Sequence, residues 1–265
     1  MKQNTEQAKK LAALLKRLEK KYKLEEPPQR EPVLQMVVAF LQWEATRELA
    51  EETLGKLLGE LVDLNELRIS FDHELVELIG EDYPRADERV ARMREALNEV
   101  YIREHRVEMQ SVAGKGKREQ RAYLESLPGM VPYVVSNVML LAYGGHALPV
   151  DAKLAKRLAD EGVVEPDSLP GQAEGQLLKM VKADDARDTW LLLQAWADDT
   201  AELEKGKSEP APAKAEKSSG TKKAKTSRKK TTKKSTRGSS KSSASKSPGK
   251  AKKKSSSKRS GKSGK

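Results

Sequence analysis

The chain has 265 residues, with 51 Lys and Arg, 40 Asp and Glu, and no cysteine. The absence of cysteine excludes disulfides, thiolate-bound zinc and iron–sulfur clusters. Because no run approaches the roughly 18 apolar residues of a membrane span, and the polar start Met1–Glu6 lacks the apolar core of a signal peptide, we expect a soluble intracellular protein.

The charge is divided between two parts of the chain. Residues 206–265 contain 22 Lys and Arg, two Glu and no aromatic residue. Such a segment buries too little apolar surface to offset the entropy of ordering it, so we expect a disordered tail. Subtracting its charges from the chain totals leaves 29 basic and 38 acidic residues before residue 206, a net charge of −9 against +20 in the tail.

The first half of the chain predicts only helices. A charged amphipathic helix is expected over 2–23, with Glu25-Glu26-Pro27-Pro28 ending it. The apolar run from Glu31 to Leu49 predicts a single central core helix, because it is apolar on several faces. Further helices are expected over 51–60, 63–69, 72–79 with Asp72 as cap, and from Pro84 to about His105.

The second half begins with an expected surface loop, 111–118, where glycines alternate with basic residues. A helix then leads into the tight turn Leu127–Pro132, and further helices are expected over 133–143, 151–162, 171–182 and 184–200. No segment shows the alternation of a strand, so the fold class is all-α. His73, His105 and His146 lie in separate segments without ligand spacing, and no metal site is predicted.

Two motifs carry a family resemblance. Residues 127–133 are Leu-Pro-Gly-Met-Val-Pro-Tyr, and residues 150–156 are Val-Asp-Ala-Lys-Leu-Ala-Lys. In sequence and spacing they resemble the helix–hairpin–helix and the aspartate motif of the endonuclease III-like (HhH-GPD) DNA glycosylase superfamily, and weaker similarity extends over about 31–199. Together with the composition and charge pattern, the resemblance divides the chain into a charged N-terminal helix over 1–30, an HhH-GPD-like all-helical domain over 31–204 and a disordered DNA-binding tail over 205–265.

The same resemblance implies a catalytic site. Asp151 corresponds to the aspartate that stabilises the transition state or orients water during base release. Tyr133 stands where members with lyase activity have a lysine, and since tyrosine cannot form a Schiff base, no lyase activity is expected. Asp151 also precedes a helix and is a good N-cap, an alternative that needs no chemistry.

The resemblance also implies the residues that face DNA. Leu127, Gly129 and Val131 belong to the hairpin whose backbone N–H groups bind a phosphate. Val131 replaces a second glycine, and because a β-branched residue rarely takes a positive φ, we expect a weakened hairpin. Glu44 stands where the family has a glutamine that fills the gap left by a flipped base, and a carboxylate there faces phosphates unfavourably. The cluster cysteines of the family are absent, and no cofactor is expected.

The tail is rich in short basic runs spaced by Ser, Thr, Ala and Gly, and it resembles the C-terminal tail of linker histones, including a Ser-Pro-x-Lys motif at 247–250. Its cations predict salt-dependent, sequence-independent binding to double-stranded DNA rather than to a membrane. The opposite charges also allow the tail to contact the acidic body and compete with DNA. The predicted DNA-binding residues of the tail are Lys222, Lys223, Lys225, Arg228, Lys229, Lys230, Lys233, Lys234, Lys252, Lys253 and Lys254.

Two functions remain open from the sequence. The first is a base-excision-repair enzyme, a DNA N-glycosylase (a hydrolase of N-glycosyl bonds) without lyase activity, which gains non-specific affinity from its tail. The second is a catalytically inactive derivative of the same fold, acting like histone H1 as a chromosome-associated DNA-binding protein. Either function places the protein in the cytoplasm and nucleoid, or in the nucleus of a eukaryote.

Overall fold

All regular structure in the described part of the chain is helical. The structure is a computed structural model that describes residues 2–199, and the side chains from Thr5 onward. The absence of any strand within residues 2–199 confirms the predicted all-α fold class. The expected end of the folded domain at residue 204 and the whole basic tail lie outside the described residues.

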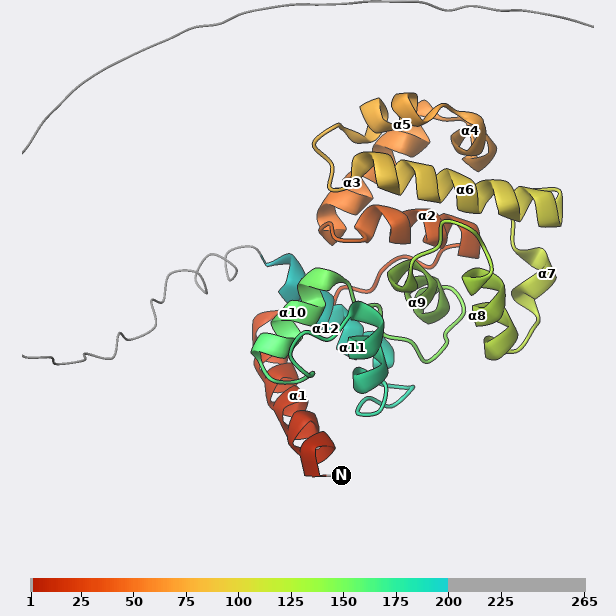
Figure 1. Ribbon diagram of the computed structural model, residues 1–265. Helices are drawn as coiled ribbons and strands as arrows, with labels where there is room; N and C mark the ends of the chain where they lie inside the picture. The colour runs from red at the N-terminus through yellow and green to blue at the C-terminus, as the bar shows by residue number, and fades with distance from the viewer. Residues whose placement is uncertain (1, 200–265) are drawn as a thin grey trace, which may run out of the picture. The chain divides into compact units, whose positions relative to one another are not determined.

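Six helices make up the first half of the described chain, and Figure 1 shows their arrangement. Their bounds are α1 Lys2–Lys21, α2 Pro32–Gln42, α3 Arg47–Glu60, α4 Leu64–Ile69, α5 Asp72–Ile79 and α6 Ala86–Glu104. Six more follow: α7 Gln110–Ala113, α8 Lys117–Glu125, α9 Pro132–Leu141, α10 Ala152–Asp160, α11 Pro170–Leu177 and α12 Ala186–Asp198.

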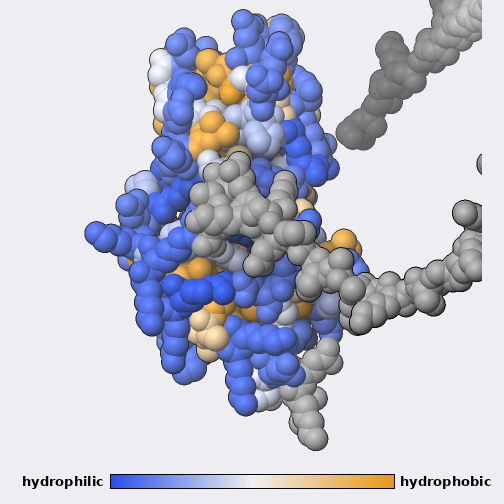
Figure 2. Space-filling model, turned by 90° about the vertical axis from the view of Figure 1, so that its left-hand side faces the viewer, coloured by the Kyte–Doolittle hydropathy of each residue, from blue (hydrophilic) through white to orange (hydrophobic). Residues whose placement is uncertain are grey.

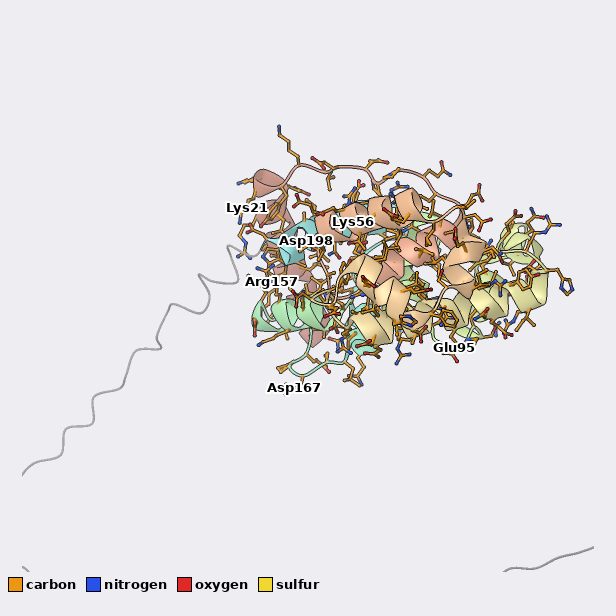
Figure 3. The ribbon with its side chains drawn as sticks, turned by 90° about the horizontal axis from the view of Figure 1, so that it is seen from above. Lys21, Lys56, Glu95, Arg157, Asp167 and Asp198 are labelled. Carbon is orange, nitrogen blue, oxygen red and sulfur yellow. The ribbon has the colours of Figure 1, made fainter. Side chains whose placement is uncertain are left out.

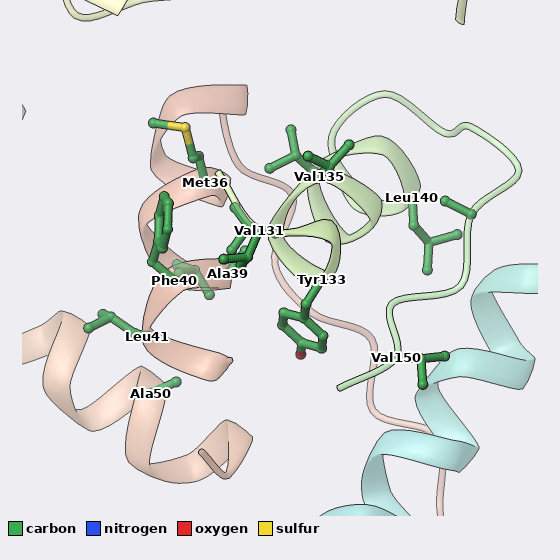
Figure 4. Close-up of a cluster of buried hydrophobic side chains, with 14 of the residues drawn as sticks. Met36, Ala39, Phe40, Leu41, Ala50, Val131, Tyr133, Val135, Leu140 and Val150 are labelled. Atoms are coloured by element: carbon green, nitrogen blue, oxygen red, sulfur yellow. The ribbon is translucent and has the colours of Figure 1, made fainter. Parts of the chain in front are cut away.

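The centre of one helix group is the pair α2 and α9. Both helices are apolar on several faces, and nearly every residue of each is buried. α2 packs most extensively against α9 and also contacts α3 and α6, while α4 and α5 pack on α6. Figure 4 shows Ala39 of α2 next to Val131, at the start of α9. The predicted core helix is therefore central, although it is shorter than expected.

A second group contains α1, α10, α11 and α12 (Figure 1). Leu11, Leu14 and Leu18 form the apolar stripe of α1, and all three are buried, with α1 packing along α12. α12 also contacts α9 and α10, and α11 contacts α9, so the two groups share one continuous core. The carboxyl end of α12 and the start of α9 thus come together in space.

The helix expected over 171–182 ends early, at Leu177, and three other expected elements also differ from the structure. The helix expected over 31–49 is divided, because α2 ends at Gln42 and the Thr46 side chain caps α3 by accepting from the Leu49 N–H at 3.2 Å. Asp72 is the first residue of α5, and Phe71 occupies the N-cap position. The stretch expected as a loop over 111–118 contains part of α7 and the start of α8.

The face of the molecule seen in Figure 2 is mainly hydrophilic, with small separate hydrophobic patches. Among residues 2–199, no helix combines the length and the hydropathy needed to cross a membrane.

Candidate functional site

The predicted hairpin joins α8 to α9 through residues 126–131. Gly129 has a φ of +75°, and a Cβ at this position would lie 2.4 Å from the carbonyl oxygen of Arg92 on α6. Arg92 also donates from Nη1 to the carbonyl oxygen of Gly129 at 3.4 Å. The packing of the turn against α6 therefore requires glycine at position 129, independently of any ligand.

The other two hairpin residues are buried. Leu127 is 3% exposed and Val131 is 8% exposed, and Figure 4 shows Val131 beside Ala39 of α2. Val131 has a φ of −113°, an extended conformation that suits a β-branched residue, so the objection that it would need a positive φ does not apply here. The side chains of these two residues are therefore not available to a ligand.

The first turn of α9 is suited to an anion. Pro132 is its first residue, and Val131 at the N-cap makes no side-chain cap hydrogen bond. The N–H groups of a first helical turn have no intrahelical partner, and the helix dipole favours negative charge there. The N–H groups at the start of α9 are therefore left without a capping side chain.

We expect Gly129→Ala to lower the free energy of unfolding by about 2–4 kcal/mol, because alanine is strained at this φ and its Cβ meets the Arg92 backbone. Gly55→Ala is the matched control, since Gly55 lies within α3 with no atom within 4 Å of its Cβ position. That substitution should stabilise the protein by up to about 1 kcal/mol. Urea unfolding of both variants tests this, and equal effects would refute the close packing of the hairpin on α6.

Asp151 is the N-cap of α10, as the capping alternative predicts. Its Oδ1 accepts a hydrogen bond from the Leu154 N–H at 2.8 Å, and the residue is 6% exposed. Burial raises the pKa of the carboxyl group, the nearby charge of Glu44 raises it further, and the Leu154 amide and Lys153 oppose both effects. The carboxylate is thus held in a fixed direction in a poorly hydrated place.

Tyr133 is buried on the first turn of α9, and Figure 4 shows its ring between α2 and the segment that carries Val150. Its hydroxyl group lies 3.5 Å from Oε1 of Gln194 on α12. Burial raises the pKa of the Tyr133 hydroxyl well above its usual value, and the charges of Asp151 and Asp198 raise it further. The structure therefore brings the two predicted catalytic residues close enough to interact.

Asp198 is a third member of this group, and the sequence analysis missed it. Its Oδ2 accepts from the backbone N–H of Arg47 at 3.1 Å, and its Oδ1 accepts from Nε2 of Gln194 at 2.8 Å. Burial raises the pKa of the Asp198 carboxyl group, and the charge of Asp151 adds to this rise. The one sequence signal was the helical spacing of Gln194 and Asp198.

A cleft of about 790 Å³ opens beside Asp198. Its walls include Thr46 and Arg47 at the start of α3 and Gln194 on α12. Figure 3 shows Asp198 at the same end of the molecule as Lys21, which also lines the cleft. The cleft thus adjoins the Tyr133–Gln194–Asp198 hydrogen-bond chain.

We expect Asp198→Asn to stabilise the protein more at about pH 7 than at about pH 4. The pKa of the Asp198 carboxyl group lies above its usual value of 3.8, so the folded protein binds the carboxyl proton more tightly than the unfolded chain does. The free energy of unfolding of the wild type therefore falls as pH rises from 3.8 through the raised pKa of the folded protein. Asparagine has no such proton, so Asp198→Asn removes this pH-dependent loss. Thermal unfolding at several pH values tests this. The control is Asp184→Asn, since Asp184 is exposed. Parallel pH profiles of stability for wild type and Asp198→Asn would contradict the prediction.

Glu44 lies in the short turn between α2 and α3, with a left-handed φ of +58°. Its Oε2 accepts from Nε of Arg85 at 2.7 Å, so its carboxylate is paired rather than bare. Its carbonyl oxygen accepts from Nζ of Lys153 at 2.7 Å, and Lys153 is two residues after Asp151. Lys153 thus links the Glu44 turn to the start of α10, which Asp151 caps.

Arg89, a fully buried residue of α6, supports the Glu44 turn from the interior of the protein. Its guanidinium group donates to the carbonyl oxygens of Phe40, of Trp43 at 2.6 Å and of Pro84 at 2.8 Å. Burial lowers the pKa of Arg89 to about 10, and electrostatic interactions with Tyr83, Glu44 and Tyr133 oppose this lowering. One side chain therefore fixes both the Glu44 turn and the loop that precedes α6.

The predicted DNA-binding lysines and arginines of the tail, from Lys222 to Lys254, lie outside the described residues.

Comparisons with known proteins identify the fold. No protein-family profile and no curated protein sequence matches the chain. Among solved structures, it is similar to a trapped endonuclease III–DNA covalent intermediate, an estranged-adenine complex, with 16% identity over 73% of this chain and 85% of that one and a TM-score of 0.57. It is similar to a thermostable thymine-DNA glycosylase, with 17% identity over 75% of this chain and 87% of that one and a TM-score of 0.50.

A third similar structure is the 8-oxoguanine glycosylase/lyase of Clostridium acetobutylicum in complex with double-stranded DNA. The identity is 14%, over 74% of this chain and 70% of that one, with a TM-score of 0.57. The described residues therefore have the helical fold of the endonuclease III-like glycosylases.

Proposed function

We propose that this protein, which has the endonuclease III-like fold, binds DNA and acts as a DNA N-glycosylase without lyase activity. The observation that carries the proposal is that Asp151 and Tyr133, which sequence resemblance assigns to the two catalytic motif positions, are both buried and interact electrostatically. Of the three similar solved structures, one is an endonuclease III–DNA covalent intermediate and two are glycosylases, and two of the three contain DNA. We carry that activity to this chain as a proposal.

In the proposed reaction, the bond between the base and C1′ of the deoxyribose breaks, and the base leaves with the bonding electrons. The Asp151 carboxylate stabilises the positive charge that develops on the sugar. A water molecule then supplies hydroxide to C1′ and a proton to the base, so the products are a free base and an abasic site. Raised pKa values keep the Tyr133 hydroxyl protonated throughout, as a hydrogen-bond donor.

The chain offers no group for a lyase step at this position. Tyr133 has no amine, so it cannot form the imine through which a lysine cleaves the strand. An iron–sulfur cluster has no thiolate ligand in a chain without cysteine, and no part of the proposed reaction depends on one.

We propose that the basic tail supplies most of the DNA affinity. The residues before position 206 carry a net charge of −9, whereas the tail carries +20. Cations on a tail release condensed counterions from duplex DNA and hold the attached domain near it. We propose further that the tail contacts the acidic body at low DNA concentration and exchanges that contact for DNA.

A second candidate function is that of a catalytically inactive, histone-H1-like DNA-binding protein. The observation in its favour is the hydrogen bond from Leu154 to Asp151, because capping α10 is a sufficient reason for an aspartate there. This candidate keeps the tail and the fold but removes the chemistry.

A base-release assay distinguishes the two candidates. The full-length protein is incubated with duplexes that each hold one uracil, mismatched, alkylated or oxidised base, and alkali then cleaves any abasic site. The enzyme should give cleavage after alkali but no borohydride-trapped cross-link. Release of no base across the panel would leave the binding protein as the function.

A further inference from the structure

A continuous line of charged side chains joins the Glu44 turn to the hairpin. Arg85 pairs with Glu44 at 2.7 Å and with Glu88 at 2.8 Å. Glu88 pairs with Arg92 at 2.9 Å, and Arg92 reaches the carbonyl oxygen of Gly129 at 3.4 Å. These residues, Glu44, Arg85, Glu88 and Arg92, are called the α6 charge line below.

The α6 charge line is accessible to solvent. The side chains of Arg85, Glu88 and Arg92 are 46%, 38% and 38% exposed. Exposed ion pairs contribute little to stability because water screens them. An arginine can therefore exchange a carboxylate for a DNA phosphate at small cost, and phosphate oxygens suit its planar donors well.

The direction of Arg85 is fixed by its surroundings. Both Glu44 and Arg85 have left-handed backbones, with φ of +58° and +55°. Residues other than glycine rarely adopt this conformation, and they keep it where neighbouring structure imposes it. Here Arg89 holds both loops, and the Arg85 guanidinium lies 5.0 Å from the centre of the Trp43 ring. The Arg85 side chain is thus presented to solvent in one orientation.

The α6 charge line ends at both parts of the proposed site. At one end, the carbonyl oxygen of Glu44 accepts from Lys153, next to the Asp151 cap. At the other end, Gly129 belongs to the hairpin turn, whose residues 126–131 include no Lys or Arg. A DNA strand that follows the α6 charge line from the hairpin to the Glu44 turn therefore passes Arg92 and Arg85.

We propose that Arg85 and Arg92 are the side chains with which the folded domain binds the phosphates of duplex DNA, and that Glu44 and Glu88 hold them in place and attenuate their affinity. This inference rests on the proposed function for the location of DNA, and it names the protein side of that contact. It also provides cationic side chains beside a hairpin that contains no Lys or Arg of its own, on a body with a net negative charge.

The test compares two double variants of the full-length protein on an undamaged duplex. Arg85→Gln/Arg92→Gln removes both proposed contacts. Arg17→Gln/Arg106→Gln removes two exposed arginines that also pair with carboxylates, so the net charge changes equally. We expect the first variant to bind about 10- to 100-fold more weakly, with a salt-dependence slope reduced by about 1.8, or about 0.9 for each lost phosphate contact.

The control variant should change both quantities much less, and equal effects of the two pairs would overturn the proposal. A second comparison uses Glu88→Gln, which should tighten binding by about 3- to 10-fold. Its control is Glu60→Gln, because Glu60 is the last residue of α3 and lies about 20 Å along that helix from the first turn of α3, which follows the Glu44 turn. Equal effects of these two would show that only net charge matters. Because the duplex holds no damaged base, these results are independent of whether base release occurs.

Discussion

Asp151→Asn should reduce base release by about 100-fold or more while leaving the fold intact. Asparagine has no charge to stabilise the developing positive sugar, and losing one such electrostatic contact costs about this factor in other enzymes. Asparagine caps a helix about as well as aspartate does, so the hydrogen bond with Leu154 N–H is retained. Single-turnover release of the preferred base, together with thermal unfolding, measures both effects.

The matched control is Asp63→Asn. Asp63 is also an N-cap, accepting from the N–H groups of Asn65 and Glu66 at 2.8 Å, but it caps α4. This variant should release the base at the wild-type rate. If Asp151→Asn retained full activity, catalysis by Asp151 would be rejected, and its role would be that of a cap alone.

Deletion of residues 206–265 should weaken binding to undamaged duplex by at least about 100-fold at low salt and flatten its salt dependence. The segment carries 22 of the 51 basic residues of the chain, and each phosphate that it neutralises adds about 0.9 to the salt-dependence slope. The remaining chain has a net charge of −9 and is repelled by DNA at long range. Fluorescence anisotropy at several salt concentrations gives both quantities.

Length and charge are separated by a second variant, in which every Lys and Arg of 206–265 is replaced by Gln. It should bind as weakly as the deletion, because the expected effect comes from charge. Circular dichroism should show unchanged helix content in both variants. Wild-type affinity in either variant would show that the tail does not supply the DNA affinity.

The sequence predicted most helices but not where the central one ends. The run from Glu31 to Leu49 has one apolar pattern, and no proline or glycine after Pro32 marks a boundary inside it. The chain turns at Glu44 because Arg89, which lies more than forty residues away, binds the carbonyl oxygens of Phe40 and Trp43. A local pattern holds no information about such a partner.

The site was predictable where motifs are local. Asp151 and Tyr133 followed from short motifs, and the structure brings them together. Asp198 did not, because its role depends on contacts with Arg47 and Gln194, and an acid near a helix end is commonly a solvated residue. The pairing of Glu44 with Arg85 was also missed, because it joins two loops that are distant in sequence.

Arg89 has a consequence for how the surface beside Asp151 meets a ligand. Its one guanidinium group binds carbonyl oxygens from the Glu44 turn and from the loop before α6 in a dry interior, so opening either loop would leave buried donors of Arg89 unpaired. The two loops consequently behave as one rigid piece before any partner arrives. A pre-organised surface loses little conformational entropy on association, so more of each contact's energy is expressed as affinity.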